Sequence, residues 1–229
     1  MTLHRFFVSP GEMSGDRFAL PASIERQVRN VLRLRDGESI VLLAGDGTEA
    51  LCRLVAAGCV VEGRRTVVTE PRHRLTIVQA LLKGDALEEV VRQATEIGVT
   101  RFRLVLTERC VARDISERKL DRLRAIAREA AEQSERGRVP AVDAPIALAG
   151  AFGSDAVLLY ERDAPLRLSA VEPPGAVIIG PEGGFTDVEV AAASGAGVAV
   201  AGLGPRILRS QSVAAAAAAI VLSRTGDFA

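Results

Sequence analysis

Two short segments near the C-terminus decide the fold of this chain. The first is Val177-Ile178-Ile179-Gly180-Pro181-Glu182-Gly183-Gly184-Phe185, and the second is Leu203-Gly204-Pro205-Arg206-Ile207-Leu208-Arg209-Ser210. The first opens with an apolar run that is typical of a buried strand, and the second follows such a run. Each then continues into a loop rich in glycine and proline. Ligands of open α/β sheets bind beyond the carboxyl ends of strands, where glycines let the backbone approach closely. The two loops therefore predict two sides of one small-molecule pocket.

Working outward from these loops, strands alternate with helices from residue 72 onward. The pattern predicts strands at 75–82, 102–106, 156–160, 176–180 and 198–201, and helices at 86–97, 116–134, 186–194 and 212–223. Gly98 is placed as a helix C-cap, and Thr186 with Glu189 has the spacing of a capping box. This alternation indicates a mostly parallel sheet with helices on its faces.

The first seventy residues have a different pattern. Short apolar runs predict strands at 5–8, 39–43, 49–55, 59–61 and 66–68, with a hairpin turn at Asp46-Gly47. One amphipathic helix is predicted at 24–34. Several short strands with tight turns indicate a small barrel, so the sequence predicts two domains, residues 1–71 and residues 72–229.

Composition excludes several classes of protein. The 229 residues are 48% hydrophobic and carry no net charge, as in a globular protein with a substantial core. No stretch is long and apolar enough to span a membrane, and the first residues lack the apolar run of a signal peptide. The three cysteines lack metal-ligand spacing and are interpreted as small buried hydrophobes. We expect a cytoplasmic protein without a metal.

The glycine-rich segment is not a phosphate site. Its glycines do not have the dinucleotide spacing, and it lacks the Lys of a P-loop while carrying the anionic Glu182. No G-x-S-x-G elbow of a serine hydrolase is present. An uncharged or cationic ligand, held by backbone groups and apolar side chains, fits these loops best.

Taken together with motifs elsewhere, the two loops resemble the signature of the ribosomal small-subunit methyltransferase E family of the SPOUT superfamily. The similarity covers nearly the whole chain. The other motifs, in order, are His4-Arg5-Phe6-Phe7, Val28-Arg29-Asn30-Val31-Leu32-Arg33, Leu82-Lys83-Gly84-Asp85, Ala94-Thr95-Glu96-Ile97-Gly98-Val99, Glu108-Arg109-Cys110-Val111, and Ala130-Ala131-Glu132-Gln133-Ser134 with Arg136, Val139 and Pro140.

The resemblance implies a fold and an activity. The fold is an α/β trefoil-knot domain with a parallel sheet, preceded by a small PUA-like β-barrel domain that binds RNA. The activity is methylation of N3 of a uridine in 16S rRNA, with S-adenosylmethionine as the methyl donor. The implied partners are 16S rRNA or the small ribosomal subunit and a second copy of the chain, packed partly through the C-terminal helix. The alanine run 214–219 fits that interface and fits a plain buried helix equally well.

The resemblance also suggests site residues. The adenosyl group is expected against Gly180, Pro181, Glu182, Gly183, Gly184, Leu203, Gly204, Ile207 and Leu208. For Glu182, contact with the amino group of the donor and support of the turn both remain open. Uridine N3 is a poor nucleophile until it loses its proton or the charge on the uracil oxygens is stabilised. The candidate catalytic residues are therefore Arg109, Arg136 and Arg209, with phosphate positioning as the alternative role.

The remaining candidates belong to RNA binding. Arg5, Arg26, Arg29 and Arg33 are expected to contact the rRNA backbone, and a solvated face is the alternative for the three helical arginines. Two departures from the family pattern matter. Ser210-Gln211-Ser212 stands where the family usually has Thr-Glu-Thr, although its hydroxyls can still cap the last helix. Glu135 stands where the family tends to have Gly.

These departures leave two other functions open. One is an RNA-binding assembly factor that keeps the fold without the chemistry, for which Gln211 is the supporting feature. The other is a SPOUT methyltransferase that acts on a ribose 2′-hydroxyl, on a tRNA or on another RNA position.

Overall fold

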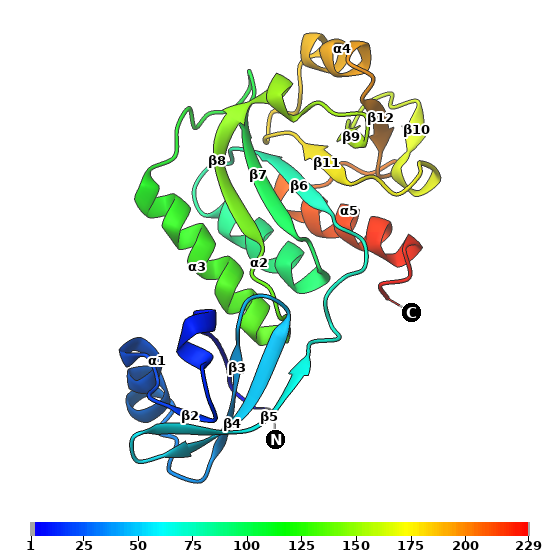
Figure 1. The fold of residues 1–229 in the computed structure, drawn as a ribbon. Helices are drawn as coiled ribbons and strands as arrows, with labels where there is room; N and C mark the ends of the chain where they lie inside the picture. The colour runs from blue at the N-terminus through cyan, green and yellow to red at the C-terminus, as the bar shows by residue number, and fades with distance from the viewer. Residues whose placement is uncertain (1–2, 229) are drawn as a thin grey trace. The chain divides into compact units, whose positions relative to one another are not determined.

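The computed structural model describes residues 3–228, and the chain folds into two compact units. The first, called here the N-terminal unit, comprises Met1–Glu70 together with Ala131–Val139. The second, called the sheet unit, comprises Pro71–Ala130 and Pro140–Ala229 (Figure 1). A segment far along the sequence therefore completes the N-terminal unit, which the residue pattern alone did not indicate.

The N-terminal unit contains a five-stranded mixed sheet in the order β1-β3-β4-β5-β2. Its strands are β1 (Arg5–Phe7), β2 (Arg17–Phe18), β3 (Ser39–Leu43), β4 (Thr48–Val55) and β5 (Gly58–Thr66). β1 pairs with β3 in parallel and the other pairs are antiparallel. The turn at Asp46-Gly47 joins β3 to β4 as predicted. The strand predicted at 59–61 is confirmed as part of β5, but the separate strand predicted at 66–68 is wrong, because a single strand pairs with β4 from residue 58 to residue 66.

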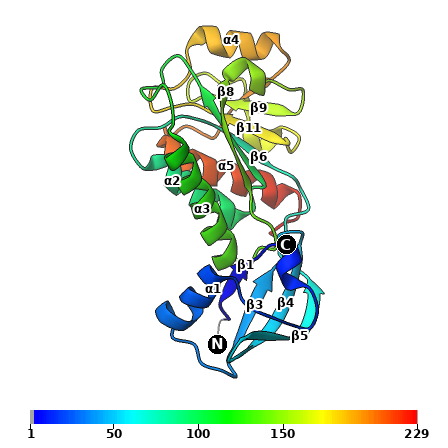
Figure 2. The same ribbon diagram turned by 60° about the vertical axis from the view of Figure 1, so that its left-hand side comes forward.

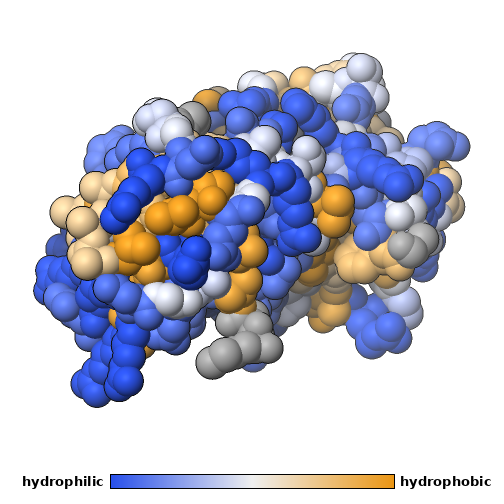
Figure 3. Space-filling view, turned by 60° about the horizontal axis from the view of Figure 1, so that its bottom comes forward, coloured by the Kyte–Doolittle hydropathy of each residue, from blue (hydrophilic) through white to orange (hydrophobic). Residues whose placement is uncertain are grey.

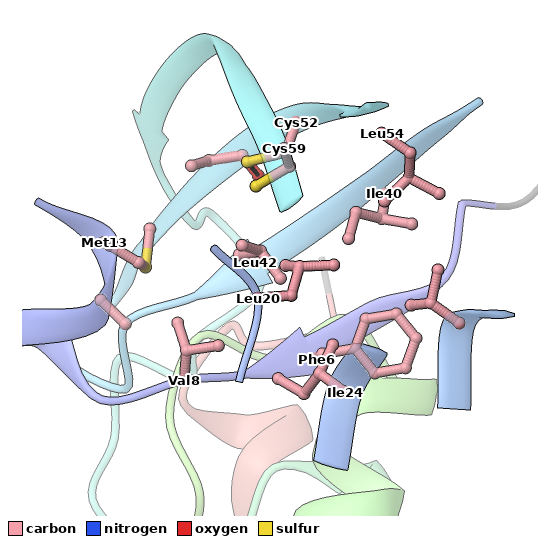
Figure 4. Close-up of a cluster of buried hydrophobic side chains, with 13 residues drawn as sticks. Phe6, Val8, Met13, Leu20, Ile24, Ile40, Leu42, Cys52, Leu54 and Cys59 are labelled. Carbon is pink, nitrogen blue, oxygen red and sulfur yellow. Dashed lines mark hydrogen bonds between the residues drawn. The ribbon is translucent and has the colours of Figure 1, made fainter. Parts of the chain in front are cut away.

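The predicted helix at 24–34 is shorter and changes type. α1 (Ala22–Arg26) begins two residues earlier, and Gln27–Val31 continues it as a π-helical turn. It ends before Arg33, whose φ of 57° lies in the left-handed region. Ile24 and Val28 are buried in one cluster with side chains of the sheet. Figure 4 shows Ile24 beside Phe6 of β1. This apolar stripe fixes the helix on the sheet and leaves its arginines on other faces.

The sheet unit is built on seven parallel strands in the order β10-β12-β9-β11-β6-β7-β8. The strands are β6 (Thr76–Ala80), β7 (Arg101–Leu106), β8 (Ala141–Ala147), β9 (Ala156–Leu159), β10 (Leu166–Arg167), β11 (Ala176–Ile179) and β12 (Ala199–Gly202). The predicted parallel sheet is thus confirmed, and β8 and β10 are two strands that the prediction missed. The central strands are almost fully buried, which explains their continuous runs of Val, Ile and Leu.

Within residues 3–228, four α-helices accompany this sheet. They are α2 (Ala86–Ile97), α3 (Glu117–Gln133), α4 (Asp187–Gly195) and α5 (Ser210–Arg224). α2 and α5 lie side by side against the sheet, whereas α4 lies beside β12 (Figures 1 and 2). Ala214, Ala217 and Ala218 are fully buried in α5, and small side chains let that helix approach its neighbours closely.

The order of the strands determines where a ligand can bind. β9 lies between β12 and β11, although both follow it in the sequence. Because all strands are parallel, the carboxyl ends of these three neighbours meet at one edge of the sheet. Such crossover points are where open α/β sheets bind ligands.

Hydrophilic residues cover most of the face shown in Figure 3, and hydrophobic side chains form separate patches among them. The three cysteines are buried and free, as predicted. Among residues 3–228, no helix is long and apolar enough to cross a membrane.

Candidate functional site

A pocket of about 340 Å³ lies at the carboxyl ends of β9, β11 and β12. Its wall includes all nine residues that the sequence predicted for ligand binding. These are Gly180, Pro181, Glu182, Gly183, Gly184, Leu203, Gly204, Ile207 and Leu208. The two loops rich in glycine and proline therefore belong to one pocket.

The sequence did not point to a third wall of the same pocket. It is the end of β9 and the turn after it, Leu159, Tyr160, Glu161 and Arg162. A strand was predicted there, but a charged turn after a strand is not distinctive. This turn lies next to the two glycine-rich loops because of the strand order, and no local signal in the sequence encodes that order. Ile179, Arg206, Ser210 and Val213 complete the lining outside the predicted set.

The first loop, residues 180–185, is called here the glycine loop. Buried Gln79 on β6 donates from Nε2 to the carbonyl oxygen of Gly180 at 3.3 Å. Arg109 donates from Nη1 to the carbonyl oxygens of Gly183 and Phe185, at 3.0 and 3.1 Å. Two side chains from neighbouring strand ends thus hold three carbonyls of the loop.

Glycine is required at one position of this loop. Gly184 has φ of 66°, in the left-handed region that side chains disfavour. A Cβ atom there would also lie 2.6 Å from Oε1 of Glu161. The backbone at Gly184 therefore runs directly beneath the Glu161 carboxylate.

Glu182 supports the turn. Its Oε1 accepts a hydrogen bond from the backbone amide of Lys83 at 2.9 Å, which ties the glycine loop to the segment after β6. Of the two roles left open for this side chain, the geometry favours holding the turn. The carboxylate is already engaged without a ligand.

The helix that follows the glycine loop is anchored as well. The predicted capping box is confirmed, with Thr186 and Glu189 bonded to each other's backbone amides. The Tyr160 hydroxyl donates to Oδ1 of Asp187, the first residue of α4, at 2.9 Å. This hydrogen bond raises the pKa of Tyr160, so the hydroxyl stays a donor. The start of α4 is thus fastened to the end of β9.

The second loop, residues 203–209, is called here the open loop. Ile207 is 82% exposed and Leu208 is 39% exposed although both line the pocket. Within residues 3–228, no hydrogen bond or ion pair holds residues 203–208. The expectation that Ser210 or Ser212 caps α5 is wrong, because the helix already begins at Ser210 and its N-cap is Arg209, without a side-chain cap.

The three candidate catalytic arginines occupy different places. Arg109 lies against the glycine loop, and Arg209 is exposed at the end of the open loop. Arg136 belongs to the N-terminal unit and is only 2% exposed. Its Nε and Nη2 donate to the Glu70 carboxylate at 3.3 and 3.1 Å. Only Arg109 and Arg209 lie in the unit that contains the pocket.

The four candidate RNA-binding arginines also divide into two kinds. Arg5 has a 9% exposed side chain that donates to Glu49 and Glu135, at 2.6 and 2.8 Å. Arg29 is held by two carboxylates and two backbone carbonyls of the N-terminal unit, those of Glu25, Asp36, Leu34 and Val55. Arg26 and Arg33 are exposed. The first pair holds the unit together, and the second pair presents its charge to solvent.

The departure at Glu135 has a structural explanation. Its φ of 61° is left-handed, the conformation for which the Gly typical of the family is suited. The Glu135 carboxylate binds Arg5, an interaction that glycine cannot make. The ion pair offsets part of the backbone strain at this position.

Comparisons with known proteins agree with this architecture. The RNA methyltransferase domain family matches residues 69–222, and the RNA methyltransferase PUA domain family matches residues 28–58. Two curated relatives are each called ribosomal RNA small subunit methyltransferase E. The protein from Mycobacterium bovis is 36% identical over 217 residues, which cover 82% of this chain and 79% of the relative. The protein from Synechocystis is 32% identical and covers 90% and 73%.

A solved structure extends the similarity to the fold. The ribosomal RNA small subunit methyltransferase E from Neisseria gonorrhoeae, bound to S-adenosylmethionine, superposes with a TM-score of 0.89 at 30% identity. The match covers 97% of this chain and 98% of that chain. The predicted fold class, a SPOUT α/β trefoil-knot domain after a small PUA-like domain, is confirmed. This chain belongs to the ribosomal RNA small subunit methyltransferase E family.

Proposed function

We propose that this protein transfers a methyl group from S-adenosylmethionine to N3 of a uridine in 16S rRNA. One observation carries the proposal. The nine residues of the two signature loops, separated in sequence, line a single pocket at the ends of β9, β11 and β12. The similar structure from N. gonorrhoeae holds S-adenosylmethionine, which supports the same ligand here.

The lining of the pocket fits this ligand. Gly180, Gly183 and Gly184 expose backbone to it, and Leu159, Ile179, Leu203, Leu208 and Val213 provide apolar contact for an adenine ring. When bound, S-adenosylmethionine supplies a methyl group made electrophilic by its sulfonium. The residues of the protein have to hold the uracil in line with that group and stabilise the charge that develops on its oxygens.

The arginines divide this work in our proposal. Arg209 has an exposed side chain beside the pocket residue Leu208, and we assign it to the uracil oxygens or an adjacent phosphate. Arg109 remains a candidate for the same role, although the guanidinium also holds the glycine loop. Arg136 is paired with Glu70, and its proposed contribution is to position the segment around it.

We assign RNA binding to residues 1–71 and methyl transfer to residues 72–229. Exposed Arg26 and Arg33 are the proposed phosphate contacts. Arg5 and Arg29 stabilise the N-terminal unit that carries them. Contacts of this kind position the RNA without reading its sequence. The proposed partner is 16S rRNA or the assembled small subunit, and we propose a cytoplasmic location to match it.

We also propose a homodimer formed through α5. Ala215, Ala216, Ala219 and Ile220 are partly exposed on this helix, opposite the alanines buried in the sheet unit. A row of small and apolar side chains suits close packing against a second copy. Sedimentation of the purified chain tests this part, and a monomer across the micromolar range contradicts it.

The activity is tested with purified protein, S-adenosylmethionine and either small subunits or free 16S rRNA from cells that lack the modification. Nucleoside mass spectrometry is expected to detect N3-methyluridine, with a characterised family member as positive control. A 2′-O-methylated nucleoside, or methylation of tRNA alone, would redirect the assignment to another SPOUT target. No product together with no calorimetric binding of S-adenosylmethionine would favour the assembly factor.

A further inference from the structure

The pocket wall carries four charged side chains, and they are not equivalent. They are Glu161, Arg162, Glu182 and Arg206. Glu182 is occupied by the Lys83 amide and supports the glycine loop. The other acid, Glu161, lies at the end of β9, on the wall that the sequence did not reveal.

The Glu161 carboxylate is turned inward over the glycine loop. Both of its oxygens lie within 3.3 Å of the position that a Cβ on Gly184 would occupy. The side chain is 34% exposed, so two-thirds of it is withdrawn from water. Within residues 3–228 it accepts no hydrogen bond, and its nearest cation is Nε of Arg162 at 4.0 Å. A partly desolvated carboxylate without a donor gains from a ligand that supplies one.

Arg162 places the opposite charge beside this acid. Its side chain is 63% exposed and its Nε is 4.0 Å from Glu161 Oε1, too far for a hydrogen bond. An anion and a cation therefore stand next to each other on one wall. The open loop contributes the apolar Ile207 and Leu208 together with Arg206. The acid and the base at the end of β9 therefore offer a charged pair beside the apolar lining formed by Leu203, Ile207 and Leu208.

We propose that Glu161 and Arg162 recognise the zwitterionic amino-acid end of the methyl donor. The α-ammonium group donates hydrogen bonds to the Glu161 carboxylate, and the Arg162 guanidinium donates to the α-carboxylate. The adenine then lies toward the apolar side chains. The inference rests on the proposed function, because it assumes S-adenosylmethionine as the ligand. It names two ligand-selecting residues that the signature loops do not contain.

Three ligands test the proposal in calorimetric titrations. S-adenosylmethionine carries the amino-acid end and the sulfonium charge, S-adenosylhomocysteine carries the amino-acid end alone, and 5′-methylthioadenosine carries neither. We expect Glu161→Gln and Arg162→Gln each to raise the dissociation constants of the first two ligands by about tenfold. This is the effect of losing one charge-assisted hydrogen bond. Binding of 5′-methylthioadenosine is expected to stay within twofold of the unmodified protein.

Asp163→Asn is the matched control, since it removes the same charge from an exposed neighbour outside the pocket lining. It is expected to leave all three affinities unchanged. Thermal unfolding of each variant verifies that the fold is retained.

Distinct outcomes would overturn the inference. If Glu161→Gln lowers the affinity of all three ligands equally, the acid contacts the ribose or supports the structure of the pocket. If only the affinity for S-adenosylmethionine falls, Glu161 interacts with the sulfonium. If the unmodified protein binds none of the three ligands, the proposed function itself fails. If it binds 5′-methylthioadenosine as tightly as S-adenosylhomocysteine, the cofactor assignment stands and this inference fails.

Discussion

The two loops that line the pocket are built in opposite ways. The glycine loop is held by Gln79, Arg109 and the Glu182–Lys83 contact, and the helix after it is fastened by Tyr160 and a capping box. The open loop exposes Ile207 and has no comparable support within the described chain. One side of the pocket is therefore preformed, and the other is free to adapt.

This contrast has an energetic consequence. A preformed wall costs little conformational entropy when a ligand binds, whereas an open loop loses freedom at that moment. An adaptable second wall also lets a ligand enter a site whose other walls are fixed. We expect substitutions in the glycine loop to alter both stability and affinity, and substitutions in the open loop to alter affinity alone.

The largest effect is expected from Gly184→Ala. A left-handed alanine costs about 1–2 kcal/mol, and its Cβ would displace the Glu161 carboxylate from 2.6 Å away. We expect calorimetry to show affinity for S-adenosylmethionine reduced by more than about tenfold. Gly195→Ala, in open space on α4, is the control and should leave affinity unchanged. Normal binding by the Gly184 variant would show that the glycine loop is not rigid.

A smaller effect is expected from Arg109→Met. The carbonyls of Gly183 and Phe185 lose their donor, and the loop loosens. The dissociation constant for S-adenosylmethionine should rise about fivefold, which corresponds to roughly 1 kcal/mol, and amide exchange at residues 183–186 should accelerate. Exposed Arg118→Met on α3 is the control. An unchanged dissociation constant with slower methyl transfer would instead place Arg109 in the chemistry.

Ile207→Ala separates affinity from stability. The side chain is 82% exposed, so the free energy of unfolding should stay within about 0.5 kcal/mol. Affinity for S-adenosylmethionine should still fall about threefold, because a partly buried apolar contact is lost on binding. Val188→Ala, exposed on α4 outside the pocket lining, should change neither quantity. A large loss of stability in the Ile207 variant would contradict the picture of an unsupported loop.

The smallest effect is expected from Tyr160→Phe, and it depends on pH. The hydrogen bond to Asp187 raises the pKa of Tyr160, so the folded state favours the protonated phenol. Its contribution to stability is present below the ordinary tyrosine pKa of about 10 and is lost as pH rises through the raised value. The melting temperature of the variant should fall below that of the unmodified protein at pH 8. The difference should shrink or reverse at pH 11, and a constant difference would exclude this hydrogen bond as its source.

Local signals in the sequence were sufficient for much of the fold. Apolar runs, Gly98 and the Thr186 capping box placed α2 and α4 within one residue of their observed bounds. The loops after β11 and β12 were recognised because glycine and proline restrict the backbone wherever they stand. The single strand β5 and the π-helical turn at Gln27–Val31 were missed, since pairing and packing determined them.

Roles of individual arginines were harder to predict. Arg5 and Arg29 have the same sequence character as Arg26, yet they are held by carboxylates and carbonyls of the N-terminal unit. One of those carboxylates comes from Glu135, 130 residues from Arg5. A basic residue in a sequence does not reveal whether its partner is an acid of the same chain or a phosphate outside it.

The sequence by itself determined the two loops and the alternation of strands and helices, because these follow from backbone preferences and hydrophobic periodicity. The resemblance of its motifs to a known family implied the nine residues of the pocket. Only the tertiary structure decided that β9 lies between β11 and β12, and thus that Glu161 and Arg162 face the same pocket. Strand order arises from which buried surfaces pack together across the whole sheet. No short segment contains that information.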